Sequence, residues 1–293
     1  MQLALEVLQI IAPVFLLAGV GFAWAAFGFE YKVQFVTRLT MNISVPALIF
    51  TALVKTEIDP DALKITALAA ALAYIGVAIA SAIALRLSRL SQRTFLPPLV
   101  FGNTGNLGLP LAFFAFGQAG FDYAVVVFAV MALFSFTLGV WLVSGNASPV
   151  SALKQPMVWA TLLGSIFLAN DISIPEWSMN TLELLGQIAI PLMLITLGVA
   201  ITRLKPASLG RAFALSLLKQ IICVIVPAGI GLWLGLPEIA FAALVLQVAT
   251  PVAVTSYMLA EKYEADSAEV AGLVVVSTLL SVLAIPLILA FVL

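Results

Sequence analysis

The chain has 293 residues, of which 63% are hydrophobic and 9% charged, with a formal net charge of −1 and a mean hydropathy of +1.18. This composition excludes an ordinary soluble protein and indicates an integral membrane protein. The chain has no histidine and a single cysteine, Cys223, so imidazole catalysis and an intrachain disulfide are excluded. Without a catalytic or metal-ligating cluster, the sequence predicts no enzyme activity, metal site or cofactor.

Uncharged runs of about 18 or more residues can cross the hydrocarbon core as helices. Eight such runs and two shorter ones predict ten transmembrane helices, all α. The first run is too long, and lacks the preceding basic residue, for a cleaved signal peptide. In chain order the runs are Val7–Phe29, Leu39–Val54, Ile65–Leu85, Thr94–Phe121, Tyr123–Leu153, Gln155–Asn170, Leu184–Thr202, Gln220–Pro237, Ile239–Ala260 and Val270–Leu293.

The basic residues predict the orientation of the chain. Ten of the 13 fall in the odd-numbered connections between the expected helices, whereas the even-numbered connections hold only Lys55 and Lys64. By the positive-inside rule the odd connections are cytoplasmic, and both termini of this multi-pass protein then lie outside.

The polar segment Ser144–Gln155 divides the ten expected helices into two sets of five. We therefore expect a first repeat at residues 1–145, a cytoplasmic linker at 146–155 and a second repeat at 156–293. Because each set has an odd number of helices, the second repeat is inverted relative to the first, as in many secondary transporters.

A carboxamide residue precedes a proline by four positions in four of the apolar runs. Proline lacks an N–H and frees the carbonyl of the residue four positions earlier, which needs protein or a water-lined cavity to satisfy it inside a membrane. The pairs occupy the second and fourth helices of each expected repeat, which supports the repeat and predicts polar interior sites. They are Asn42/Pro46, Asn106/Pro110, Gln187/Pro191 and Gln247/Pro251.

The segment Phe101–Pro110 reads FGNTGNLGLP and is the least regular part of any expected helix. Its glycines give backbone freedom, and its amides, threonine and freed carbonyls supply hydrogen-bonding groups, so we expect it to be partly unwound near the membrane centre. The corresponding segment Leu246–Thr255 has no glycine, and a gentler break is expected there.

Four segments resemble the auxin efflux carrier family, which contains the plant PIN proteins and bacterial relatives within a wider group that includes the bile-acid sodium symporters. They are MNISVPALIF at 41–50, GNTGNLGLP at 102–110, QIAIPLMLITLGVAI at 187–201 and QVATPVAVTSYMLAEKY at 247–263. The resemblance implies ten transmembrane helices in two inverted five-helix repeats, with helices 4 and 9 broken and crossing at Pro110 and Pro251.

The resemblance also implies two structural domains with different roles. Helices 1, 2, 6 and 7 would form a scaffold, through which family members often form homodimers, and the other six would form a mobile transport domain. The substrates would be small organic anions, namely auxin in plants and dicarboxylates such as malate or malonate for bacterial relatives. The implied setting is the lipid bilayer of a bacterial cytoplasmic (inner) membrane, with no nucleic-acid partner.

The candidate substrate-binding residues lie at the two expected breaks. A carboxylate needs uncharged donors where no arginine is buried nearby, so we nominate Asn103, Thr104 and Asn106 in one break and Gln247 and Thr250 in the other. The alternative is that these groups only satisfy unwound backbone. The breaks themselves are assigned to Gly105, Pro110 and Pro251.

Secondary candidates are Asn42 with Pro46 and Gln187 with Pro191, for which a helix kink with a locally satisfied amide is the alternative. A further candidate is Lys219, since a charge inside a membrane helix is a functional candidate by default. Its long stem could instead snorkel to the cytoplasmic interface.

Glu183 and Glu269 are expected at helix ends, and no carboxylate falls in the middle of an expected helix. This absence disfavours an antiporter of the buried-carboxylate type, while the coupling ion, sodium or proton, stays open. The expected function is a secondary transporter of a small organic anion that works by elevator-like alternating access. A sodium-coupled anion symporter is the alternative, and an anion channel is disfavoured because no ring of charges is present.

Overall fold

The computed structural model describes residues 2–144, 155–170, 172–204 and 207–292. This described part is mostly helical and contains no β-strand, so the expected all-α membrane fold is confirmed. Seven of its helices are long and apolar enough to cross a membrane, and two shorter apolar helices accompany them. The ten-helix inverted repeat stays a prediction, and nearly all of the expected linker at 146–155 lies outside the described residues.

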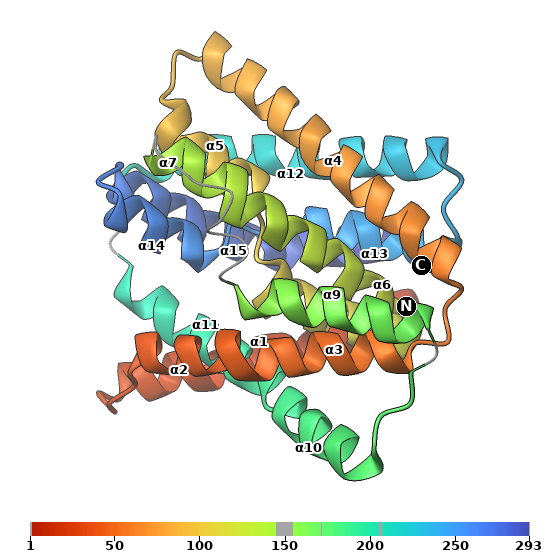
Figure 1. Cartoon of the computed structure of the whole chain (residues 1–293). Coiled ribbons are helices and arrows are strands. Elements are labelled where there is room, and N and C mark those ends of the chain that lie inside the picture. Colours follow the sequence, from red (N-terminus) through yellow and green to blue (C-terminus); the bar gives the residue numbers. More distant parts are fainter. Residues whose placement is uncertain (1, 145–154, 171, 205–206, 293) are drawn as a thin grey trace.

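Figure 1 shows the arrangement of the helices. Three π-helical turns interrupt or join helices in the described residues. The helices are α1 (Gln2–Ala26), α2 (Val33–Leu39), α3 (Val45–Lys55), α4 (Pro60–Leu87), α5 (Gln92–Val100), α6 (Leu109–Phe134), α7 (Val140–Ser144), α9 (Pro156–Ala169), α10 (Glu176–Gln187), α11 (Ala189–Arg203), α12 (Leu209–Trp233), α13 (Glu238–Val248), α14 (Val254–Lys262) and α15 (Ser267–Val292). The π-helical turns are η1 (Thr40–Ser44), η2 (Thr104–Gly108) and η3 (Ser135–Gly139).

The helices form two bundles. In Figure 1, α1, α2, α3, α9, α10 and α11 lie together in the lower part of the view, and we call them the first bundle. The remaining helices, α4 to α7 and α12 to α15, form the crossover bundle, in which α12 packs on α4 and α15 and α6 packs on α13. In the first bundle α1 packs on α11 and α3 packs on α9 and α10.

The contact between α1 and α11 is a backbone contact made possible by glycine. A Cβ atom on Gly21 would overlap the carbonyl oxygen of Ile195, and one on Gly198 would overlap that of Ala18. Small residues allow this approach in membrane bundles, where van der Waals packing and hydrogen bonds hold helices together without a hydrophobic driving force. The two glycines therefore fix the first bundle at its centre.

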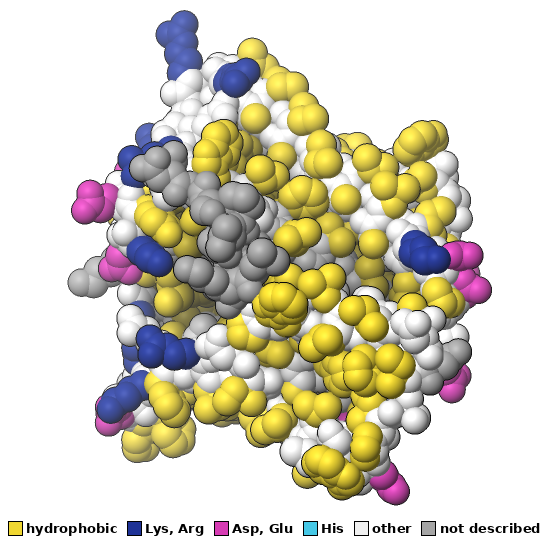
Figure 2. Space-filling model, viewed as in Figure 1, with side chains coloured by type: hydrophobic (Ala, Val, Ile, Leu, Met, Phe, Trp, Pro, Cys, Tyr) yellow, Lys and Arg dark blue, Asp and Glu magenta, His cyan; other side chains and the backbone are white. Residues whose placement is uncertain are grey.

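Figure 2 shows an apolar surface between two charged edges. Lysine and arginine gather mostly at the left edge, where α2, α4, α7, α11 and α14 end or begin, and acidic residues are prominent at the right edge. Exposed apolar side chains such as Leu217, Ile221 and Leu283 face outward between the edges. A lipid bilayer matches this distribution of polar ends and apolar flanks.

Two helix boundaries differ from those that the charges suggested. α12 begins at Leu209 rather than near Gln220, because Arg211 and Lys219 lie inside the helix. The boundary expected at Asp122 is replaced by a turn at Gly117, where φ is 63° and ψ is −153°. That conformation is accessible mainly to glycine. A charged residue thus marked the chain reversal only to within a few residues.

Asp122 is a buried carboxylate near a helix end, because it follows the turn at Gly117 by five residues. It lies inside α6 with an exposed fraction of 3%. Its carboxylate accepts a hydrogen bond from Gln118 Nε2 at 2.7 Å and contacts the side chain of Thr56. Two neutral donors therefore accompany the burial of this acid. Asp122 therefore lies beside the chain reversal and not in the middle of a membrane-crossing segment, so the expectation of no central carboxylate is not contradicted.

Candidate functional site

The two broken helices meet in the crossover bundle. After α5 ends, residues 101–103 leave the helix, and after α13 ends, residues 249–253 do the same. The two non-helical segments run antiparallel, with a bridge between Gly102 and Val252. The Asn103 N–H donates to the Pro251 carbonyl at 2.7 Å. Both interruptions predicted from the sequence are therefore present, and they contact each other directly.

The relative severity of the two breaks differs from the expectation. The glycine-free segment around Pro251 is non-helical over five residues, 249–253, and the glycine-rich one over three, 101–103. Proline disfavours helical conformation in the residue before it as well as removing a donor. In the glycine-rich segment Pro110 comes after the break and lies at the start of α6, where proline is tolerated. The expectation of a gentler second break is wrong.

Four of the nominated polar residues are buried at this crossing. Asn103, Thr104, Gln247 and Thr250 have exposed fractions of 3% or less. The Thr250 hydroxyl donates to the Gln247 carbonyl at 2.7 Å. The Asn103 amide nitrogen, the Thr104 hydroxyl and both amide atoms of Gln247 have no hydrogen-bond partner in the described part of the chain. Unpartnered polar groups at membrane depth indicate a site that a ligand or water completes.

Two glycines permit the close approach at the crossing. A Cβ atom on Gly102 would overlap the Thr250 hydroxyl, and one on Gly108 would overlap the Gln247 amide. At Gly105 a Cβ atom would lie 3.1 Å from the Phe128 ring. The glycines of FGNTGNLGLP therefore serve close packing between α13, α6 and the break.

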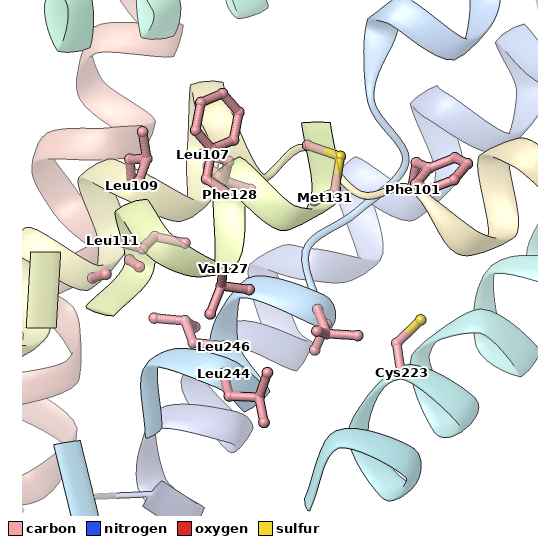
Figure 3. Packing of buried hydrophobic residues seen from close by; sticks show 14 of the residues in the cluster. Phe101, Leu107, Leu109, Leu111, Val127, Phe128, Met131, Cys223, Leu244 and Leu246 are labelled. Atoms are coloured by element: carbon pink, nitrogen blue, oxygen red, sulfur yellow. The ribbon is translucent and has the colours of Figure 1, made fainter. Parts of the chain in front are cut away.

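A cavity with an empty volume of about 570 Å³ opens beside the crossing. Asn103 and Asn106 contribute amides to it, and Met41 and Met157 reach it from the first bundle. The other lining residues come from the crossover bundle, and Figure 3 shows three of them, Phe101, Phe128 and Met131, in the buried cluster. The lining residues from the crossover bundle are Phe101, Gly102, Gly105, Phe128, Met131, Ala132, Ser135, Phe136, Ala253 and Thr255. We call this the crossover cavity.

A second cavity, of about 430 Å³, continues from the crossover cavity between α2 and α11. The two share Met41, Asn106 and Thr255, so Asn106 lies at their junction. Threonines 37, 40 and 196 and methionines 193 and 258 add to its lining. The cavity leads toward Val33, at the end of the bundle where basic residues gather.

A third cavity, of about 1180 Å³, lies between the bundles at the other charged edge. α3 and α10 supply Lys55 and Glu183, which form an ion pair, and α6 supplies Gln118. Gln187 also lines this cavity rather than the crossing. None of its lining residues is shared with the crossover cavity.

The secondary candidates mark helix interruptions away from the crossing. η1 precedes Pro46, and the Asn42 amide donates to the Arg38 carbonyl of its own helix at 2.7 Å. Gln187 ends α10, and Pro191 lies in the first turn of α11. The bond of Asn42 within its own helix matches the alternative of a kink with a locally satisfied amide.

Lys219 lies deep in the crossover bundle. Its exposed fraction is 2%, and its ammonium donates to the Leu99 carbonyl at 3.1 Å and to Cys223 Sγ at 3.6 Å. The side chain therefore does not snorkel to the interface. It also lines none of the three cavities described above.

Sequence reasoning missed most of the cavity wall. Met41, Phe128, Ser135 and Met157 come from three separate segments that read as ordinary apolar helices. An aromatic or methionine residue in such a run carries no signal of its direction. Thr255 was detectable, since it belongs to the segment Leu246–Thr255 that also contains Thr250.

Buried polar groups at a crossing of two broken helices, beside a cavity between two apolar bundles, define a membrane transport protein. The profile of the family described as membrane transport protein matches residues 140–289. A transporter from Methanothermobacter thermautotrophicus is 29% identical over 269 residues, which cover 88% of each chain. The chain belongs to the auxin efflux carrier family of membrane transport proteins.

Proposed function

We propose that this protein is a secondary carrier that moves a small organic anion across the cytoplasmic membrane by alternating access. The observation that carries the proposal is the crossover cavity, where the unpartnered Asn103 amide nitrogen and the Asn106 amide line a space between two bundles. Uncharged donors of this kind bind a carboxylate through charge-assisted hydrogen bonds. Asn103 and Asn106 are the proposed primary contacts, with Thr104, Gln247 and Thr250 supporting the break that presents them.

The cavity lining favours one class of anion. Among the described residues it contains the rings of Phe101, Phe128 and Phe136 and the thioethers of three methionines, but no lysine or arginine. One carboxylate can be held by the two amides while an apolar body contacts the rings and thioethers. The second carboxylate of malate or malonate would be buried without a partner, which is costly. We therefore propose an auxin-like monocarboxylate in preference to a dicarboxylate.

Polar contacts tie each bundle together internally and support an elevator-like movement. Arg93 donates to the carbonyls of Val143 and Tyr263, all in the crossover bundle. Arg211 pairs with Glu269 at 2.9 Å in the same bundle, whereas Lys55 pairs with Glu183 within the first bundle. Two bodies that are each cross-linked in this way can slide past each other as units.

The positions of the cavities favour a carrier over a channel. The crossover cavity and its continuation face the basic edge, while the third cavity lies at the opposite edge and shares no lining residue with them. A binding site reached from one side at a time is what alternating access requires. The first bundle is then the proposed scaffold and, by family resemblance, the surface through which two copies would associate.

A substrate screen tests the proposed function. Purified protein is heated with indoleacetate, malonate or malate, with sodium or with choline as the counter-ion. Indoleacetate is expected to raise the midpoint of unfolding, because a ligand that binds only the native state stabilises it, by about 2.7 kcal/mol at a hundred times its Kd. A larger shift with the dicarboxylates would overturn the proposed substrate class, and no shift with any organic anion would count against the site.

The proposed topology has its own test. In a Cys223→Ser background, a cysteine introduced at Ser88 is expected to react with an impermeant thiol reagent only from the cytoplasmic side, and one at Ser173 only from outside. Both positions are exposed, and the basic residues Arg86 and Arg89 flank Ser88. Reaction of both from the same side would contradict the proposed orientation.

A further inference from the structure

The break in α5 leaves a backbone carbonyl without its helical donor. In a continuous helix the Leu99 carbonyl would accept from the Asn103 N–H, but that N–H donates to Pro251 across the crossing. The Leu99 carbonyl therefore lies at a helix carboxyl end, which carries about half a negative charge from the aligned peptide dipoles. Leu99 is fully buried, so bulk solvent cannot satisfy this end.

The group that satisfies it is a cation on a neighbouring helix. Lys219, from the middle of α12, donates its ammonium to the Leu99 carbonyl at 3.1 Å. The Cys223 thiol, one helical turn further along, lies 3.6 Å from the ammonium and 3.7 Å from the carbonyl oxygen. None of the ion pairs in the described residues includes Lys219. Its charge is thus opposed by a helix end and not by a carboxylate.

The carboxyl end of the other broken helix, α13, has different hydrogen-bond donors. At the end of α13 the Gln247 carbonyl accepts from the Thr250 hydroxyl at 2.7 Å and from the Thr250 N–H at 3.3 Å. This end is capped from within its own segment by neutral donors. The two halves of the crossing therefore differ in charge, and only the α5 end holds a tethered cation among the described residues.

Carboxyl ends of broken helices are where secondary transporters bind sodium ions, because the freed carbonyls coordinate them. We propose that the Lys219 ammonium is a built-in cation that occupies this position at the end of α5, so that no exchangeable metal cation is needed there. A buried lysine without a carboxylate partner is otherwise costly to keep in a membrane helix. Lys219 is in this view a positioning residue, which holds the break in the form that presents Asn103.

The test uses Lys219→Ala, which removes three methylene groups and the ammonium, and it requires no substrate. Propylammonium matches the deleted part and should bind the vacated site, raising the unfolding midpoint of the variant by about 2 to 4 °C when it is present at several times its Kd. The same compound should not stabilise the wild-type protein, and 1-propanol, which has the shape without the charge, should not stabilise the variant. Lys64→Ala, at an exposed lysine, is the matched control and should show no response.

A folded Lys219→Ala protein that gains no stability from propylammonium would overturn the proposal. The wild-type protein supplies a second measurement should the variant fail to fold. At constant ionic strength its unfolding midpoint should be the same in sodium chloride and in choline chloride, and a sodium-specific rise would show that a metal cation binds after all. Because no anion is used, either failure would leave the proposed carrier function untouched.

Discussion

Replacement of Gly21 by alanine is expected to destabilise the protein by about 1 to 3 kcal/mol or more, since the added methyl group overpacks a close contact. The Cβ atom would overlap the backbone carbonyl of Ile195 in α11, and backbone cannot move aside as a side-chain end can. A midpoint shift of about 2 to 4 °C per kcal/mol follows for a chain of this size. Thermal unfolding of the purified protein measures it.

Gly19→Ala is the matched control for this prediction. Gly19 lies two residues earlier on α1, and a Cβ atom there would meet nothing within 4 Å. Alanine in a helix interior is favoured over glycine by roughly 0.5 to 1 kcal/mol, so this variant should be as stable as the wild type or slightly more stable. Gly198→Ala, on the opposite side of the contact, should reproduce the loss. Equal midpoints for the Gly19 and Gly21 variants would contradict the proposed backbone contact.

Asn106→Leu is expected to weaken anion binding by roughly 10-fold to 150-fold. Leucine keeps the volume but cannot donate, and a hydrogen bond to a charged group contributes about 1.5 to 3 kcal/mol, at about 1.4 kcal/mol per tenfold in affinity. Asn106 lines two cavities, so its amide could contact the proposed anion in either space. Titration of indoleacetate into detergent-purified protein measures the change.

Substitutions of three further amides are expected to weaken anion binding less than Asn106→Leu does. Gln247→Leu should weaken binding less, because the amide is fully buried against Gly108 and lies outside the crossover cavity. Asn42→Leu and Gln187→Leu should leave affinity nearly unchanged, since one amide bonds its own helix and the other lines the third cavity. Stronger losses from these two than from Asn106→Leu would mean that the anion is not held at the crossing.

The amide and proline spacing predicted the interruptions because the reasons are local. A proline removes a donor wherever it stands, and Pro251 lies in the middle of the non-helical residues 249–253. The prediction that the glycine-free break would be the gentler one failed for a physical reason. Glycine content does not determine how long a break is, because the π-helical turn η2 resumes helical structure directly after Asn103.

Charges located the helix ends only approximately. A charge ends a membrane helix only if it cannot be satisfied at depth, and Lys219 is satisfied there by the Leu99 carbonyl, a partner 120 residues away in the sequence. The same reason explains why the role of Lys219 stayed open between substrate contact and snorkelling. Its partner exists only because α5 is broken and α12 passes beside the break.

The sequence by itself determined that this is an all-helical membrane protein of the auxin efflux carrier family, and it located the polar residues of the crossing, because composition, proline chemistry and local motifs act within a few residues. Only the tertiary structure decided which side chains form the crossover cavity, where Phe128, Met41 and Met157 meet Asn106 from separate helices. The direction of an apolar side chain in a membrane helix depends on which neighbour it packs against. Lipid and protein interior are equally apolar, so hydrophobicity alone cannot distinguish the two faces.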